Sequence, residues 1–213
     1  MTDREIRVIK KILKQLAPQQ PLTIFEYGSG NSTVYFADYL SSRGISFTWT
    51  AIDNDQRWAD KVKKDIRAKN LADQVTVFSE DFLPYWKKKN WQSDKKIDGA
   101  DFSPAVKAEF DYINKPNELG KKYDLIIVDG RFRRRCLEVT AQCLKPGGLV
   151  FLHDAERQYY RPGLRIHKAA VSMSGGRFSF FQRRDNVIAL ASDSQATLAS
   201  LEAVFNKQGR PIK

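Results

Sequence analysis

The segment Ile24-Phe25-Glu26-Tyr27-Gly28-Ser29-Gly30-Asn31-Ser32-Thr33 decides the fold of this chain. Residues 22–25 form a short apolar and β-branched run, which is typical of a buried parallel strand. Two glycines and three residues that commonly begin helices follow at once. Glycine has no Cβ atom, so the backbone of this turn can approach a ligand closely, and the first N–H groups of the next helix supply polar contacts. The segment predicts a nucleotide-type ligand site, and a tight turn without a ligand is the alternative.

The segment departs from the dinucleotide-binding fingerprint G-x-G-x-x-G. That fingerprint needs a third glycine or an alanine at position 33, where this chain has Thr33, and it needs no acid such as Glu26 at the strand end. Glu26-x-Gly28-x-Gly30 resembles motif I of the class I S-adenosylmethionine-dependent methyltransferases. The resemblance implies that Glu26 orients the amino-acid end of the cofactor. The other cofactor contacts expected in this segment are Gly28, Gly30, Ser32 and Thr33.

Acids also follow the second and third predicted strands. Residues 46–52 run into Asp53, which lies at the end of a strand–helix–strand unit, where a carboxylate accepts hydrogen bonds from ribose hydroxyls. Alternatively, Asp53 caps the helix that begins near Gln56. Residues 74–78 precede Asp81, and the methyltransferase resemblance implies that Asp81 lies against the adenine amine, unless it is a solvated turn residue.

The fourth and fifth predicted strands end in acids as well. Residues 123–128 precede Asp129, and residues 149–153 precede Asp154. Both strand ends resemble those of the small-molecule O-methyltransferases, including the metal-dependent catechol and macrocin-sugar groups. The resemblance implies that Asp129 faces the transferred methyl group and that Asp129 and Asp154 hold a Mg²⁺ ion. Ala155 stands where a third metal ligand is expected.

A reaction without metal stays open, because two carboxylates make a poorer Mg²⁺ site than three protein ligands. In that case His153 or Asp129 acts as the general base for a substrate hydroxyl, since the pKa of histidine lies near neutrality. Alternatively, His153 packs under a helix, because neighbouring strand residues point to opposite faces. The segment Val128-Asp129-Gly130-Arg131-Phe132-Arg133 lacks the Pro-Pro pair of base N-methyltransferases and also resembles a group of uncharacterised bacterial methyltransferases.

Basic side chains predict an anionic partner. The chain has 36 Lys and Arg against 25 Asp and Glu, a net charge of +11. Nucleic acid, a phosphorylated or uronic-acid sugar, a coenzyme A thioester and a membrane surface all fit this charge, and so does solubility alone. Arg131 and Arg133 are the candidates to bind a substrate carboxylate or phosphate. Tyr159, in a polar and aromatic loop at the same end of the sheet, is the candidate to close the substrate pocket.

The pattern as a whole predicts a single domain over residues 1–213. A helix covers residues 3–16. Residues 82–122 are too long for an ordinary connection and are interpreted as a substrate lid, a nucleic-acid surface or a packed insertion. Residues 177–181 and 186–191 predict an antiparallel hairpin. The expected fold is α/β, Rossmann-like and doubly wound, with a mostly parallel seven-stranded sheet that ends in this hairpin.

The sequence has no run of 18 apolar residues and opens on a charged helix, so we expect a cytoplasmic protein without a membrane span. A homodimer stays open. The predicted function is S-adenosylmethionine-dependent methyl transfer to an oxygen nucleophile of a small or sugar-like, anionic substrate. The alternatives are an RNA or protein methyltransferase, a non-catalytic module that binds nucleotide or nucleic acid, and a nicotinamide-dependent oxidoreductase, which Thr33 disfavours.

Overall fold

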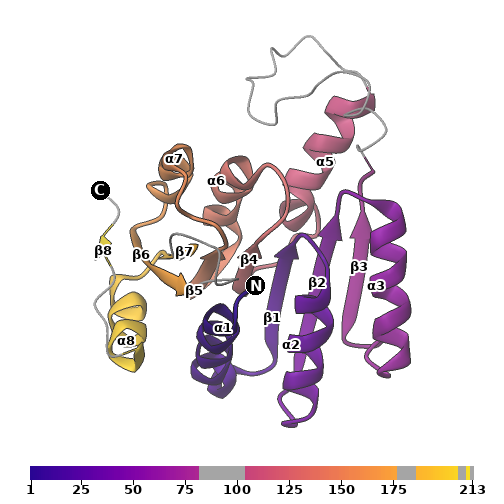
Figure 1. Ribbon diagram of the computed structural model, residues 1–213, viewed down its shortest axis with the longest axis horizontal. Coiled ribbons are helices and arrows are strands. Elements are labelled where there is room, and N and C mark those ends of the chain that lie inside the picture. The colour runs from indigo at the N-terminus through magenta and orange to yellow at the C-terminus, as the bar shows by residue number, and fades with distance from the viewer. Residues whose placement is uncertain (82–103, 177–185, 206–209, 212–213) are drawn as a thin grey trace.

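A mixed sheet with helices on both faces organises the chain (Figure 1). The computed structural model describes residues 1–81, 104–176, 186–205 and 210–211. Within these residues the strand order is β3-β2-β1-β4-β5-β7-β6-β8. The strands are β1 (Leu22–Tyr27), β2 (Phe47–Asp53), β3 (Val75–Ser79), β4 (Tyr123–Val128), β5 (Leu144–Leu152), β6 (Ala169–Gly176), β7 (Asn186–Ser192) and β8 (Arg210–Pro211).

The strand directions confirm the predicted doubly wound, mostly parallel sheet. Strands β1 to β5 pair in parallel, β7 is antiparallel to β5, and β6 and β7 form the C-terminal antiparallel hairpin. The two-residue β8 pairs with β6 and adds an eighth strand to the predicted seven.

The helices form a layer on each side of the sheet. Buried side chains of α1 (Asp3–Leu16), α2 (Asn31–Ser41), α3 (Gln56–Ala68) and α8 (Gln195–Phe205) share one hydrophobic cluster with the sheet. Those of α5 (Pro104–Glu118), α6 (Arg133–Cys143) and α7 (Arg161–Leu164) share the cluster on the opposite face. Two short 3₁₀ helices, Ala17–Gln19 and Gln158–Tyr160, complete the described helical elements.

The central strands are apolar because both of their faces are covered. On β1, Ile24 packs into the cluster beneath α1 to α3, and the next residue, Phe25, packs into the cluster beneath α5 and α6. All six residues of β4 are buried. The continuous apolar runs in the sequence therefore reflect helices on both sides of a parallel sheet.

The structure corrects one predicted strand boundary and identifies the strand that pairs with β7. Strand β5 begins at Leu144 and not at residue 149, because the β4–β5 register passes from Tyr123 opposite Leu144 to Leu125 opposite Leu149 through an irregularity. The strand that pairs with β7 is Ala169–Gly176. The predicted strand over residues 177–181 lies outside the described residues.

The long segment between β3 and β4 contains an ordinary crossover helix. Helix α5 connects the two strands and buries Tyr112 and Ile113 against the sheet. Residues 82–103 lie outside the described residues, so the interpretation of this part as a lid, a nucleic-acid surface or an insertion stays a prediction. No helix within the described ranges is both long enough and apolar enough to cross a membrane.

The turns that follow β1 and β4 touch each other through their backbones. Gly28 has a φ of +89°, and a Cβ atom on it would lie 2.7 Å from the Cα atom of Gly130. A Cβ atom on Gly130 would lie 2.8 Å from the Gly28 nitrogen and 2.0 Å from the Tyr112 hydroxyl. The close approach of the two turns therefore requires glycine at both positions.

We expect the substitution Gly130→Ala to lower the free energy of unfolding by about 2 kcal/mol or more, because the added methyl group overpacks this contact. Urea denaturation followed by circular dichroism measures the change. Gly30→Ala is the matched control, since a Cβ atom there would lie no closer than 3.7 Å to the Trp58 indole. Equal stability of the Gly130→Ala variant and the wild type would contradict this account.

Candidate active site

A cavity of about 850 Å³ opens at the carboxyl ends of β1, β2 and β4. This volume lies in the range of small-molecule and cofactor sites, and strand ends are where open α/β sheets bind ligands. The described residues that line it are Met1, Ile6, Gly28, Ser29, Gly30, Asn31, Ser32, Tyr35, Phe36, Asp53, Asn54, Trp58, Asp129, Gly130, Arg131 and Arg133. They include seven of the predicted site residues, namely Gly28, Gly30, Ser32, Asp53, Asp129, Arg131 and Arg133.

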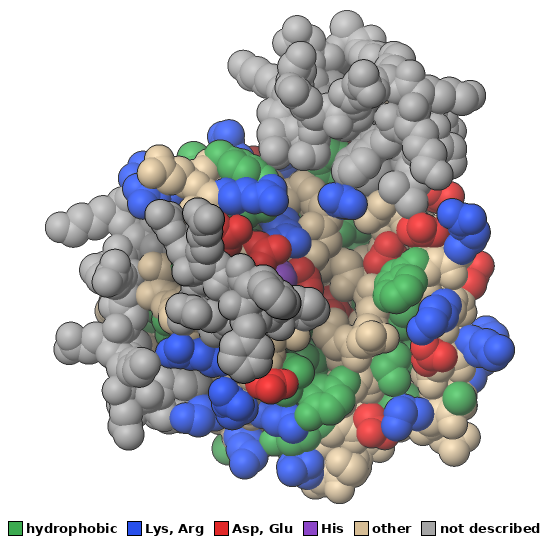
Figure 2. All heavy atoms as spheres, viewed as in Figure 1, with side chains coloured by type: hydrophobic (Ala, Val, Ile, Leu, Met, Phe, Trp, Pro, Cys, Tyr) green, Lys and Arg blue, Asp and Glu red, His purple; other side chains and the backbone are tan. Residues whose placement is uncertain are grey.

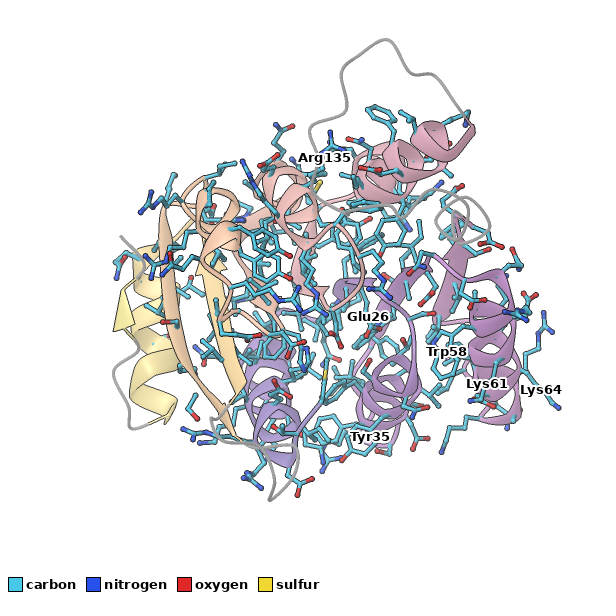
Figure 3. All side chains as sticks on the ribbon, turned by 45° about the horizontal axis from the view of Figure 1, so that its top comes forward. Glu26, Tyr35, Trp58, Lys61, Lys64 and Arg135 are labelled. Atoms are coloured by element: carbon cyan, nitrogen blue, oxygen red, sulfur yellow. The ribbon has the colours of Figure 1, made fainter. Side chains whose placement is uncertain are left out.

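Glu26, near the end of β1, is fully buried (Figure 3). Ser32 Oγ donates to its Oε1 at 2.6 Å, and Thr33 Oγ1 and Trp49 Nε1 donate to its Oε2 at 2.6 and 3.1 Å. Burial raises the pKa of Glu26 to about 7 in spite of these hydrogen bonds. Glu26 does not line the cavity but holds the start of α2 in place through Ser32 and Thr33.

Thr33 also explains the departure from the dinucleotide fingerprint. Its hydroxyl accepts a hydrogen bond from the Gly30 nitrogen at 2.9 Å while donating to Glu26. A glycine or an alanine at position 33 could make neither contact. Thr33 is fully buried and does not line the cavity, so its contacts are with the protein.

Asp53 faces the cavity from the end of β2. Its Oδ2 accepts from Ser29 Oγ at 3.2 Å, and its Oδ1 accepts from the Asp55 nitrogen at 3.0 Å. Burial raises the pKa of this carboxyl group. The helix-cap alternative for Asp53 is wrong, because Asp55 caps α3 by accepting from the nitrogens of Arg57 and Trp58. Asp53 is therefore available to a ligand in the cavity.

Two aromatic side chains that the sequence analysis did not assign to the site line the cavity. Trp58, in the first turn of α3, donates its indole N–H to the Ser29 carbonyl at 2.7 Å, which fixes the ring beside the glycine turn. Tyr35 projects from α2 (Figure 3). Their side chains remain 40% and 43% exposed, so their rings are accessible to a ligand.

Five charged residues meet where β4 and β5 end, and we call Glu5, Asp129, Arg133, His153 and Asp154 the charged cluster. The guanidinium of Arg133 lies 3.2 Å from Asp129 Oδ1 and 3.3 Å from Asp154 Oδ2. It also donates to the carbonyls of Gly130, Asp129 and His153 at 3.0, 3.1 and 2.6 Å. Figure 2 shows acidic side chains around a histidine near the middle of this face.

His153 lies between three carboxylates of the charged cluster. Its Nδ1 is 2.9 Å from Asp129 and 3.3 Å from Asp154, and its Nε2 is 3.3 Å from Glu5. Burial disfavours the imidazolium, but the three carboxylates outweigh it and raise the pKa of His153 to about 11. His153 and Arg133 hold the pKa of Asp154 down to about 2. A protonated imidazole has no lone pair for a proton, so this geometry does not fit the predicted general-base role of His153.

The charged cluster does not fit the predicted Mg²⁺ ion. Asp129 and Asp154 face the cations Arg133 and His153, so their oxygens already interact with positive charge. Mg²⁺ requires near-octahedral oxygen coordination, and a guanidinium between the two carboxylates opposes it sterically and electrostatically. The described part of the chain contains no group of three or more acidic, histidine or cysteine residues arranged for a metal ion.

The remaining predicted site residues lie apart from the cavity or have partners within the protein. Asp81 is exposed and is not among the lining residues. Tyr159 packs its ring 4.3 Å from that of Tyr160, and its hydroxyl is 3.5 Å from an Arg157 nitrogen. Both predicted substrate arginines, Arg131 and Arg133, line the cavity, and the guanidinium of Arg133 is held by the charged cluster.

Glu5 is the member of the charged cluster that sequence reasoning missed. It is fully buried on α1 and forms a capping box with Thr2, since the Thr2 nitrogen donates to Glu5 Oε2 at 2.5 Å and the Glu5 nitrogen donates to Thr2 Oγ1 at 3.2 Å. The motif Thr2-x-x-Glu5 is visible in the sequence. Glu5 also contacts His153, but this contact depends on how α1 packs, so no local pattern in the sequence predicts it.

The sequence of this chain is similar to a known family of domains. A family model described as a methyltransferase domain matches residues 25–155. A search of curated proteins found no match. The strand-end residues Asp53, Asp129 and Asp154 all lie within the matched part of the chain.

Solved structures share the fold at low sequence identity. An O-methyltransferase from Bacillus cereus in complex with SAH is 14% identical, with a TM-score of 0.54 and 90% of each chain covered. The O-methyltransferase TomG from Streptomyces achromogenes, in complex with SAM, is 12% identical, with a TM-score of 0.52 and 90% of each chain covered. Cofactor-bound Rv0187 from MTB is 15% identical, with a TM-score of 0.54, covering 86% of this chain and 78% of the other.

We expect the stabilising effect of His153 to depend on pH. Its pKa is raised in the folded state, so its contribution is fully present below about pH 6.5 and is lost as the pH rises toward 11. Urea unfolding of the wild type and of His153→Gln at pH 6 and pH 10 measures this. The stability difference should be larger at pH 6, and a difference that does not change with pH would contradict the charged state of His153.

We also expect Mg²⁺ at millimolar concentration to leave the melting temperature unchanged, because an ion that does not bind the folded state cannot stabilise it. Thermal unfolding with and without Mg²⁺, after treatment with a chelator, tests this. A rise in melting temperature that disappears in Asp129→Asn would show that a metal ion does enter the charged cluster.

Proposed function

Because the chain belongs to the family of methyltransferase domains, we propose that it binds S-adenosylmethionine and transfers the methyl group to an oxygen nucleophile of a small or sugar-like, anionic substrate. The observation that supports this most is the convergence of the glycine turn, Asp53 and Asp129 on one cavity of about 850 Å³. Three parallel strands bring these residues to one edge of the sheet.

In this proposal the cofactor lies across the strand ends. Asp53 accepts hydrogen bonds from the ribose hydroxyls, and the backbone of Gly28 and Gly30 passes beside the amino-acid end. Glu26 acts indirectly, because its carboxylate holds Ser32 at the cavity wall. Trp58 provides a fixed aromatic face for the nucleoside.

The chemical step needs little beyond positioning, since the sulfonium of the cofactor already activates the methyl group. A substrate oxygen attacks the methyl carbon in line with the carbon–sulfur bond. The new oxygen–carbon bond forms as the carbon–sulfur bond breaks, and S-adenosylhomocysteine leaves. Asp129 is the carboxylate of the charged cluster that lines the cavity, and it receives the hydroxyl proton.

Oxygen as the nucleophile is supported by analogy. Two of the structures with the same fold are described as O-methyltransferases, in complex with SAH and with SAM. An anionic substrate is supported by the net charge of +11 and by Arg131 at the cavity wall. These features support an anionic group on the substrate that enters the cavity.

We expect S-adenosylhomocysteine to bind in calorimetric titrations, and NAD not to bind. Asp53→Ala should weaken the binding of S-adenosylhomocysteine by about tenfold or more, because charge-assisted hydrogen bonds to ribose are lost. Asp73→Ala is the matched control, since Asp73 is exposed in the turn before β3 and does not line the cavity. Tight NAD binding, or equal effects of the two substitutions, would overturn the assignment.

A further inference from the structure

A second concave site lies between α1, α2 and the turn after α2, and cations make up nearly all of its lining. Its volume is about 320 Å³, and the described lining residues are Arg7, Lys10, Lys11, Lys14, Tyr39 and Arg43. No carboxylate is among them. Figure 2 shows blue side chains gathered in the lower middle of the face, where Figure 1 places α1. We call this cavity the basic site.

Most cations of the basic site have no acidic partner. Within the described residues, Arg7, Lys10, Lys14 and Arg43 form no ion pair, although other basic side chains do. On α3, for example, Lys61 lies 2.9 Å from Asp65. Cations that converge without counter-charges repel one another, so a bound anion would stabilise this arrangement.

Tyr39 supplies a second, independent sign of a ligand. Its side chain lines the basic site and is only 7% exposed, and its buried hydroxyl has no hydrogen-bond partner among the described residues. Buried polar groups normally form hydrogen bonds, so the Tyr39 hydroxyl lacks an acceptor that an oxygen of a ligand would supply. The ring is covered by Arg43, whose Cζ is 3.9 Å from the ring centroid, and by Lys10, whose Nζ is 5.0 Å away.

The cations around Tyr39 are held before any ligand arrives. An Arg43 nitrogen lies 3.5 Å from the Tyr39 carbonyl, in addition to its stacking on the ring. Lys10 Nζ also lies 4.8 Å from the Tyr35 ring centroid, and Tyr35 lines the large cavity. Lys10 and Tyr35 therefore connect the basic site with the proposed cofactor site.

We propose that the basic site binds the phosphate groups of a ligand that carries two or more of them. Phosphate presents several acceptor oxygens, which suits two guanidinium groups, several ammonium groups and a hydroxyl donor from different elements. If this ligand is the methyl acceptor, the inference rests on the proposed function. The phosphate groups are then the anionic part of the proposed substrate. Phosphate recognition then lies between α1 and α2 and not at Arg133, whose guanidinium the charged cluster already holds.

The test is calorimetric titration of the full chain with inorganic pyrophosphate and, separately, with a single-stranded RNA oligonucleotide. We expect pyrophosphate to bind, and the double substitution Lys10→Ala with Arg43→Ala to weaken binding by about tenfold or more. Tyr39→Phe should weaken binding with little effect on thermal unfolding, because it removes only the hydroxyl. Lys64→Ala, an exposed lysine of α3, is the control and should bind like the wild type (Figure 3).

The two ligands separate the sources of phosphate. RNA binding that depends on Lys10 and Arg43 and falls with added salt, in the absence of pyrophosphate binding, would support the site and identify a nucleic-acid backbone as the ligand. Failure of both ligands to bind, or equal effects of Lys64→Ala and the double substitution, would overturn the inference. S-adenosylhomocysteine titration of the same variants tests the cofactor site separately, so failure of one proposal is distinguishable from failure of the other.

Discussion

The backbone contact between Gly28 and Gly130 sets the spacing on which the cavity depends. The turns after β1 and β4 approach so closely that neither position has room for a side chain. Parallel pairing of these strands, with β2 on the other side of β1, then places Asp53 and Asp129 around the same opening. The cavity thus follows from the sheet order together with one steric constraint, and the helices complete its walls.

The charged cluster links this edge of the sheet to the first helix. Arg133 joins the ends of β4 and β5, and His153 adds Glu5 of α1. Three carboxylates face two cations, so the charges nearly balance without an added ion. Buried charges are tolerated when they are paired in this way, and a network with several partners holds each side chain in one orientation. Asp129, the carboxylate of the cluster at the cavity wall, is therefore held in one orientation by two cations.

Local sequence patterns predicted the strands, the glycine turn and the position of Asp53, because each depends on residues close together in the chain. The charged cluster could not be predicted in the same way. The sequence around an arginine beside a predicted pocket is the same whether the arginine binds substrate or neighbouring carboxylates. Only the packing of α6 against β5 shows that Arg133 binds carboxylates. The pKa of His153 is raised by Asp129 and Asp154 against the effect of burial, and also by Glu5, which lies on a distant helix and has no local signal in the sequence.

Trp58 gives the cavity an intrinsic fluorophore. Its indole is anchored to the Ser29 carbonyl yet is 40% exposed, whereas Trp49, the other tryptophan of the described residues, is 1% exposed and lies parallel to Phe36 in the core. The emission of an indole follows the polarity of its surroundings. A molecule that enters the cavity would change the surroundings of Trp58 and leave those of Trp49 as they are, so the chain carries its own optical signal of occupancy.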